Sequence, residues 1–282
     1  MNLPLLGKHL FVKRFKRWER KITVSKRQQF VLITLFVTLV LIGTQLVTKD
    51  IARYPLVVFL FIVTYVGAAF GLREDLAKIE WVTLLLPPAM YSAAVALFYF
   101  LLPVRWLTRI PVALLFAIGF YAFLLTQNIY NVAANRTIAL LRAARSIGFL
   151  LTLATFYLLV LTILSFRGFP WGSTLLITII SWCMAFPSLW SIELTPNASS
   201  RVLALSTAIA VMIGELTWVL GFWPMPPAMI ALLLSAVFYS TLGMGQEYVD
   251  NKLYKKTIIE FLLVSIVIFL FALLSSKWRG SV

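Results

Sequence analysis

The feature that most constrains this chain is a series of nine apolar runs, each close to the length of a membrane span. A helix rises about 1.5 Å per residue, so roughly 20 apolar residues cross the hydrocarbon layer of a bilayer. Backbone N–H and C=O groups in lipid must be bonded within the segment, which a helix achieves. The predicted spans are Phe30–Val47, Tyr54–Leu72, Trp81–Leu102, Pro111–Ala133, Ile147–Phe166, Ser173–Leu194, Val202–Trp223, Ala228–Tyr248 and Thr257–Ser276. The sequence therefore predicts an all-α, polytopic transmembrane helix bundle.

Composition supports the same fold class. Hydrophobic residues make up 61% of the chain and charged residues 12%, whereas soluble domains average about 45–50% and about 25%. A soluble fold could not cover so much apolar surface, so the excess must face lipid. Because the connections are short, we divide the chain into a basic segment, residues 1–28, and a transmembrane domain, residues 29–282.

The distribution of charge predicts an orientation. The net charge is +15, and placing the N-terminus in the cytoplasm puts 18 of the 25 Lys and Arg residues on the cytoplasmic side and 7 outside. Cytoplasmic loops carry such an excess of positive charge. No small-x-small cleavage site follows the first run, so we expect an uncleaved span. We predict a multi-pass protein of the plasma (inner) membrane that has no nucleic-acid partner.

The basic segment has the periodicity of an amphipathic helix. Phe11, Phe15 and Trp18 share one helical face. The remaining arc carries Lys13, Arg14, Lys16, Arg17, Arg20 and Lys21. Such a helix is expected to lie on the anionic lipids of the cytoplasmic leaflet. It could simply anchor the first span, or it could dock a cytoplasmic protein partner.

Glu215 is the most informative single residue, because it is predicted to lie well inside the seventh span. A charged group at such depth costs about 2.5–3.5 kcal/mol, so we expect Glu215 to face protein or a water-filled cavity. It could be a proton or cation site in a transport pathway, or a structural hydrogen-bonding group. Its candidate partners are Gln127, Asn128 and Asn131 of the fourth span, which could equally sit at the cytoplasmic interface.

Small residues and prolines predict how the spans pack. Gly67 and Gly71 form a GxxxG pattern, and Gly214 belongs to a small face on the seventh span. Pro87-Pro88 and Pro187 are expected to kink the third and sixth spans. Broken helices border substrate sites in many transporters, although packing kinks are commoner.

The sequence offers little for metal or acid–base chemistry. Cys183 is the single cysteine and His9 the single histidine, so a metal site of several His or Cys ligands is excluded and no cofactor is expected. There are no clustered acids and no phosphate loop. Arg142 with Arg145 could meet an anionic headgroup.

The stretch from Glu80-Trp81-Val82 to Pro103 resembles uncharacterised bacterial polytopic membrane proteins. That resemblance implies no activity and favours a bacterial plasma membrane. The number of spans, the kinks and Glu215 favour a transporter or permease for a small solute or lipid, although few polar residues lie inside the spans. One alternative is a non-catalytic membrane subunit or scaffold that docks a partner through its N-terminal helix. Another is a lipid-handling enzyme.

Overall fold

The computed structural model describes residues 25–46, 50–72, 79–102, 106–134, 139–166 and 168–276. The helices in these residues are α2 (Lys26–Leu46), α3 (Asp50–Leu72), α4 (Glu80–Thr83), α5 (Leu86–Tyr99), α6 (Trp106–Ala133), α7 (Leu141–Ser165), α8 (Pro170–Glu193), α9 (Ser200–Leu220), α10 (Pro227–Val249) and α11 (Lys255–Ser275). Within them, nine spans are long and apolar enough to cross a membrane, with α4 and α5 forming one. The prediction of an all-helical protein with nine spans is confirmed for the described residues. The largest boundary shift is at the fifth span, which begins at Leu141 rather than Ile147.

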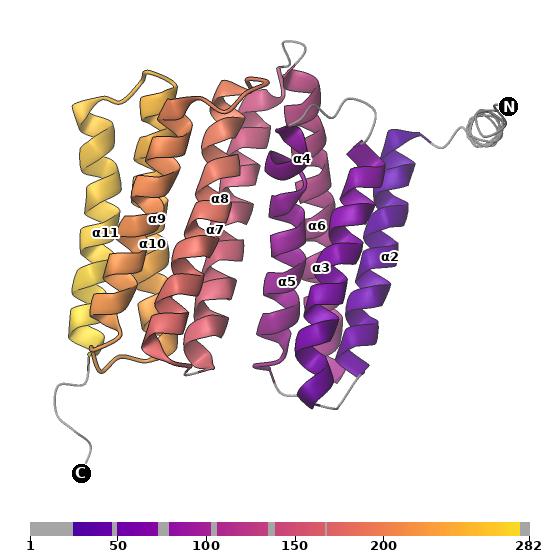
Figure 1. Cartoon of the computed structure of the whole chain (residues 1–282), viewed down its shortest axis with the longest axis horizontal. Helices are drawn as coiled ribbons and strands as arrows, with labels where there is room; N and C mark the ends of the chain where they lie inside the picture. The colour runs from indigo at the N-terminus through magenta and orange to yellow at the C-terminus, as the bar shows by residue number, and fades with distance from the viewer. Residues whose placement is uncertain are drawn as a thin grey trace, which may run out of the picture.

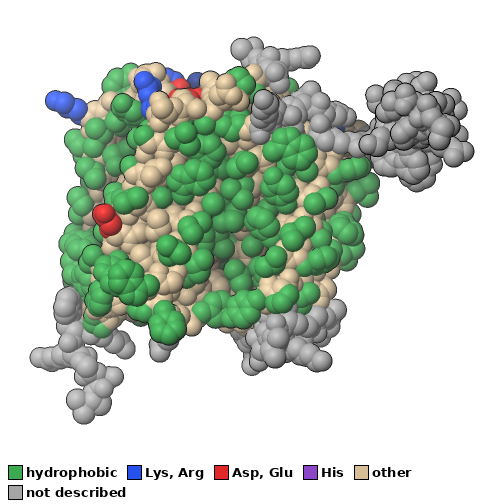
Figure 2. Space-filling view, viewed as in Figure 1, with side chains coloured by type: hydrophobic (Ala, Val, Ile, Leu, Met, Phe, Trp, Pro, Cys, Tyr) green, Lys and Arg blue, Asp and Glu red, His purple; other side chains and the backbone are tan. Residues whose placement is uncertain are grey.

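The helices stand side by side and alternate in direction, so their ends gather at two faces (Figure 1). One face holds the start of α2 and the ends of α6, α8 and α10, and we term it the N-terminal face. The side wall between the faces is covered mostly by apolar side chains (Figure 2). Among the described Lys and Arg residues, all but Arg53 and Arg109 belong to helix ends or loops at the N-terminal face. The fold is thus compatible with a multi-pass membrane protein.

Helix α7 occupies the middle of the bundle. It packs against α5 and α6 on one side and against α8 and α10 on the other. In the core Phe156 of α7 stacks on Phe238 of α10, with ring centroids 4.1 Å apart. Helix α11 is peripheral, since it packs mainly on α10 and Ala272 is its one buried residue among those described.

Most of the Ser and Thr hydroxyl groups inside the described spans donate to a carbonyl of their own helix. Thr34 Oγ1 donates to the Phe30 carbonyl at 2.7 Å, and Ser181 Oγ donates to the Ile177 carbonyl at 2.6 Å. Such bonds to the carbonyl four residues earlier satisfy a hydroxyl without a partner helix. Ser and Thr can therefore occupy an apolar environment without marking a site.

The third span is broken where its prolines predict. Helix α4 ends at Thr83, the residues Leu84 and Leu85 form a turn, and Pro87 and Pro88 lie in the first turn of α5. Proline lacks an N–H, which is tolerated in a first turn but not in a helix interior. Helix α8, in contrast, continues through Pro187.

Glycines occur where helices approach closely. A Cβ at Gly71 would lie 3.0 Å from Ile33 Cδ1 of α2, and one at Gly67 would lie 3.3 Å from Ile33 Cγ2. A Cβ at Gly214 would overlap Thr178 Oγ1 of α8. Each of these contacts joins two helices of this chain.

We expect Gly214→Leu to destabilise the protein by about 1–3 kcal/mol, because the new side chain must displace Thr178 and separate α8 from α9. Thermal unfolding in detergent measures the change. Gly43→Leu is the matched control, because a Cβ there meets no atom within 4 Å. Equal melting temperatures for the two variants would contradict the close contact.

Candidate functional site

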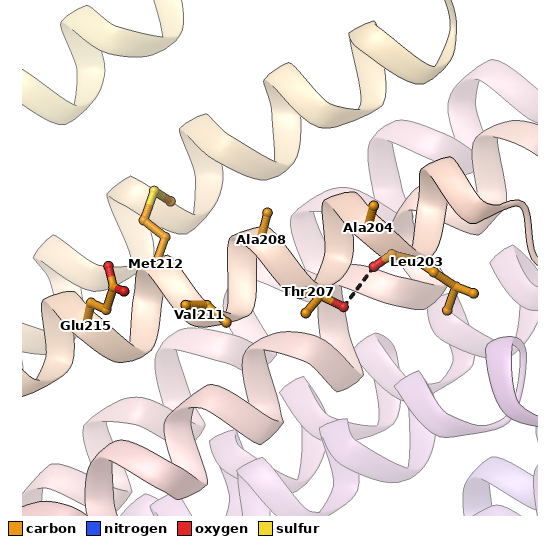
Figure 3. Close-up of a pocket in the computed structure, with 7 residues that line it drawn as sticks. All are labelled: Leu203, Ala204, Thr207, Ala208, Val211, Met212 and Glu215. Carbon is orange, nitrogen blue, oxygen red and sulfur yellow. Dashed lines mark hydrogen bonds between the residues drawn. The ribbon is translucent and has the colours of Figure 1, made fainter.

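Glu215 lies on the outer face of α9, not against its neighbours. Its side chain is exposed, and Figure 3 shows it with the other lining residues of a depression on α9. It makes no hydrogen bond or ion pair with any residue that the structure describes. It borders a shallow depression of about 570 Å³ whose lining residues all belong to α9: Leu203, Ala204, Thr207, Ala208, Val211, Met212 and Glu215. Of the two environments expected for Glu215, protein or a water-filled cavity, the single chain does not provide the first, because α9 turns its small face, with Gly214, toward α8.

The structure does not bring Glu215 together with the amides of α6. Helix α9 packs against α8 and α10, whereas α6 packs against α2, α5 and α7. Gln127 and Asn131 are buried, and Asn128 is half-buried. Asn131 Nδ2 donates to the Leu72 carbonyl, the last of α3, at 3.3 Å. An end carbonyl has no partner within its own helix, so Asn131 caps α3 near the N-terminal face.

A polar cluster that the sequence did not predict joins α2, α5 and α6 at the face opposite the N-terminal face. Arg109 Nε donates to the hydroxyl of Tyr99 at 2.9 Å, and Arg109 Nη2 donates to the Gln45 carbonyl at 3.5 Å. These bonds hold the guanidinium beside the end of α2. The cluster ties helix ends together, and it opens into no cavity described here.

A cavity of about 770 Å³ lies at the N-terminal face. We term it the interfacial cavity, because the helix ends that form it would lie at the membrane–water boundary. Its lining residues are Ala139, Leu141, Arg142, Arg145, Ser146, Phe149, Ile192, Tyr239, Gly243, Gln246, Glu247, Asp250, Lys252 and Phe261. They come from α7, α8, α10, α11 and the adjoining loops, so separate parts of the sequence build one site.

Positive groups gather at the α7 side of the cavity. Arg142 and Arg145 are three residues apart and so lie on neighbouring turns of one helix face. Arg145 Nη2 donates to the Ile192 carbonyl at 2.9 Å, which fixes the side chain against the end of α8. Arg145 Nε is buried without a hydrogen-bond partner among the described residues. The α7 N-terminus lacks a side-chain cap, so its first N–H groups add positive potential.

The deeper wall of the cavity is aromatic. The ring of Tyr239 lies 5.6 Å from that of Phe149 and 5.2 Å from that of Phe261, measured between centroids. Gly243 lets Phe261 approach, because a Cβ there would overlap the Phe261 ring. A basic mouth above an aromatic wall suits an amphiphile that has an anionic head and an apolar body.

The acidic side of the cavity is partly neutralised. Lys252 pairs with Asp250 in the loop between α10 and α11. Gln246 Nε2 donates to Ser188 Oγ at 2.9 Å and so links α10 to α8. Glu247 lines the cavity on the same wall. No cluster of three His, Cys, Asp or Glu residues that could hold a metal occurs in the described part of the chain.

Other residues singled out in the sequence do not contribute to this cavity. The basic amphipathic segment with Phe11, Phe15, Trp18 and its Lys and Arg residues lies outside the described residues. Glu80 is buried, 4% exposed, at the start of α4. Of the residues singled out in the sequence, Arg142 and Arg145 are the two that line the interfacial cavity.

The family model for proteins of unknown function, DUF5656, matches residues 31–275, which is most of the chain. The chain belongs to this family. The match covers every span and agrees with the resemblance to an uncharacterised family that the sequence suggested. Searches of curated proteins and of solved structures gave no match. Membership in DUF5656 assigns no activity.

We expect the interfacial cavity to admit water. In a Cys183→Ser background, Phe149→Cys should react with a small, charged thiol reagent applied from the N-terminal face, because Phe149 lines the cavity. Phe156→Cys is the control, since Phe156 lies about two turns further along the same helix and is 0% exposed. Labelling is read by the mass increase of the protein. Equal labelling of the two variants would contradict a water-filled cavity that reaches Phe149 but not Phe156.

We also expect Asn131 to matter more for stability than Asn128. Asn131→Ala leaves the buried Leu72 carbonyl without its donor, which costs about 1–3 kcal/mol. Asn128→Ala is the matched control on the same helix, because Asn128 is half-buried and makes no hydrogen bond among the described residues. Thermal unfolding in detergent measures both. A larger loss for Asn128→Ala would contradict the capping role.

Proposed function

We propose that this protein is a permease-like protein of the plasma membrane that binds an anionic lipid in the interfacial cavity and moves it between leaflets. The N-terminal face is then the cytoplasmic face. The observation that supports the proposal is Arg145, which is held by the Ile192 carbonyl and keeps a buried Nε donor unpaired beside Arg142. A phosphate oxygen is a suitable acceptor for such a donor.

The chemistry of the cavity supports this substrate class. Two arginines favour a phosphate-bearing head, and the rings of Phe149, Tyr239 and Phe261 favour an acyl chain or another apolar body. A fully water-soluble anion would make no apolar contact with the aromatic wall. The break at Pro87-Pro88 supports a permease over a rigid scaffold, because broken helices recur beside transport pathways.

The proposal predicts selective lipid binding. Native mass spectrometry of the detergent-solubilised protein should show tighter binding of dioleoyl phosphatidylglycerol than of dioleoyl phosphatidylcholine. Arg145→Gln should weaken phosphatidylglycerol binding by about tenfold or more, because a charge-assisted hydrogen bond contributes about 1.5–3 kcal/mol. Arg201→Gln is the matched control, since Arg201 lies at the same face but outside the cavity, beside Tyr248.

Movement is tested separately from binding. Vesicles that contain the protein and a dye-labelled phosphatidylglycerol are treated with an impermeant reductant, which bleaches dye in the outer leaflet alone. Loss of more than half of the signal is expected with the native chain and not with Arg145→Gln. Selective binding without movement would refute the permease and leave a lipid-binding membrane subunit. Equal binding by Arg145→Gln, Arg201→Gln and the native chain would refute the site.

A further inference from the structure

We propose that helix α11 is a side gate of the interfacial cavity, and that its first half moves away from α10 to let a lipid pass between the cavity and the bilayer. This inference deepens the proposed function and rests on it, because it names the route by which the anionic lipid reaches its site. The starting observation is that α11 supplies one wall of the cavity, through Phe261, while it stands at the edge of the bundle (Figure 1).

Helix α11 is the least firmly packed of the nine described spans. Within an apolar stretch of 18 residues, 6% are buried in α11, whereas 33% or more are buried in each of the other spans. Apolar side chains gain little by leaving lipid for another apolar helix, so membrane helices are held together by close packing and by hydrogen bonds. The position of α11, which packs mainly on α10, therefore depends on a small number of contacts.

Hydrogen bonds between two serines fasten the middle of α11 to α10. Ser240 Oγ of α10 donates to the Phe261 carbonyl at 2.6 Å. Ser265 Oγ of α11 lies 2.7 Å from Ser240 Oγ and 3.3 Å from the Ala236 carbonyl. Each hydroxyl has one proton, so two bonds join the helices at a time. We term Ser240 and Ser265 the latch, because their bonds hold the helix turn that carries the cavity wall.

The far end of α11 is anchored separately. Ala272, the one buried residue of α11 among those described, lies there, about 16 Å along the helix from Phe261. Trp223 Nε1, in the loop between α9 and α10, donates to Ser276 Oγ at 2.8 Å. The Trp223 ring also meets the Phe269 ring edge-on, with centroids 6.2 Å apart. These contacts form a pivot, so the half with Phe261 can move while the span stays in place.

The loop between α10 and α11 is long enough for this movement. It consists of residues 250–254, since α10 ends at Val249 and α11 begins at Lys255. Five extended residues span about 16–18 Å, whereas the axes of packed helices lie about 8–10 Å apart. The start of α11 can therefore separate from α10 without strain on the chain. Such a displacement takes the Phe261 ring away from Gly243 and opens the cavity toward the bilayer.

A disulfide across the latch tests the gate. In a Cys183→Ser background, Ser240→Cys with Ser265→Cys places two thiols where the hydroxyl oxygens lie 2.7 Å apart, which suits a disulfide. The protein is loaded with dioleoyl phosphatidylglycerol and mixed with an excess of the deuterated lipid, and native mass spectrometry follows the exchange. Oxidation should slow the exchange at least tenfold, and reduction should restore it.

The matched control joins two helices that the gate does not involve. Gly214→Cys with Thr178→Cys links α9 to α8, because a Cβ at Gly214 lies 3.3 Å from Thr178 Cβ. Oxidation of this control should leave the exchange rate unchanged. Equal exchange by the oxidised and reduced latch would overturn the gate and leave the proposed lipid site intact. Failure of both forms to hold phosphatidylglycerol would refute the proposed function, and the gate with it.

The hydrogen bonds of the latch are tested without a cross-link. Ser240→Ala should speed the exchange about threefold, which corresponds to about 0.6 kcal/mol, the average for a hydrogen bond between membrane helices. Thr241→Ala is the matched control at the next residue, because Thr241 Oγ1 donates to the Val237 carbonyl of its own helix at 2.8 Å. Equal exchange by these two variants would overturn the role of the latch.

Discussion

The structure depends on one constraint: a backbone within lipid must satisfy its own hydrogen bonds. This constraint makes every long apolar run a helix and leaves the helix ends as the places where polar groups remain to be satisfied. The Leu72 carbonyl receives its bond from Asn131, the Ile192 carbonyl from Arg145 and the Gln45 carbonyl from Arg109. These three polar side chains act at helix ends, and the interfacial cavity arises where the end of α8 meets the start of α7.

The fold was largely predictable because its governing signal is local. Span length and hydropathy depend on about 20 consecutive residues, so the nine spans could be placed without knowing how they pack. The break before α5 was predictable for the same reason, since proline acts on its own helix. The partners of each helix were not predictable. Gly214 marked a close contact, yet nothing in the sequence distinguished α8 from any other apolar helix as the surface that receives it.

The candidate site was harder to predict, because its residues are far apart in the sequence. Arg142 and Arg145 were visible as a pair, but Tyr239 and Phe261 gain meaning only when α10 and α11 are placed beside α7. For Glu215 the prediction failed for a different reason. Its depth could be estimated from the sequence, whereas the direction in which it points depends on the packing of α9.

Helix α11 has a consequence for the order in which the molecule is completed. It packs mainly on α10, yet its Phe261 closes one wall of the interfacial cavity. A ribosome delivers this span after the other eight, so the bundle can assemble while the cavity still lacks that wall. That side of the cavity is open during this interval and closes only when α11 docks. After docking, a lipid of the kind we propose can pass this wall only when the outermost helix moves aside.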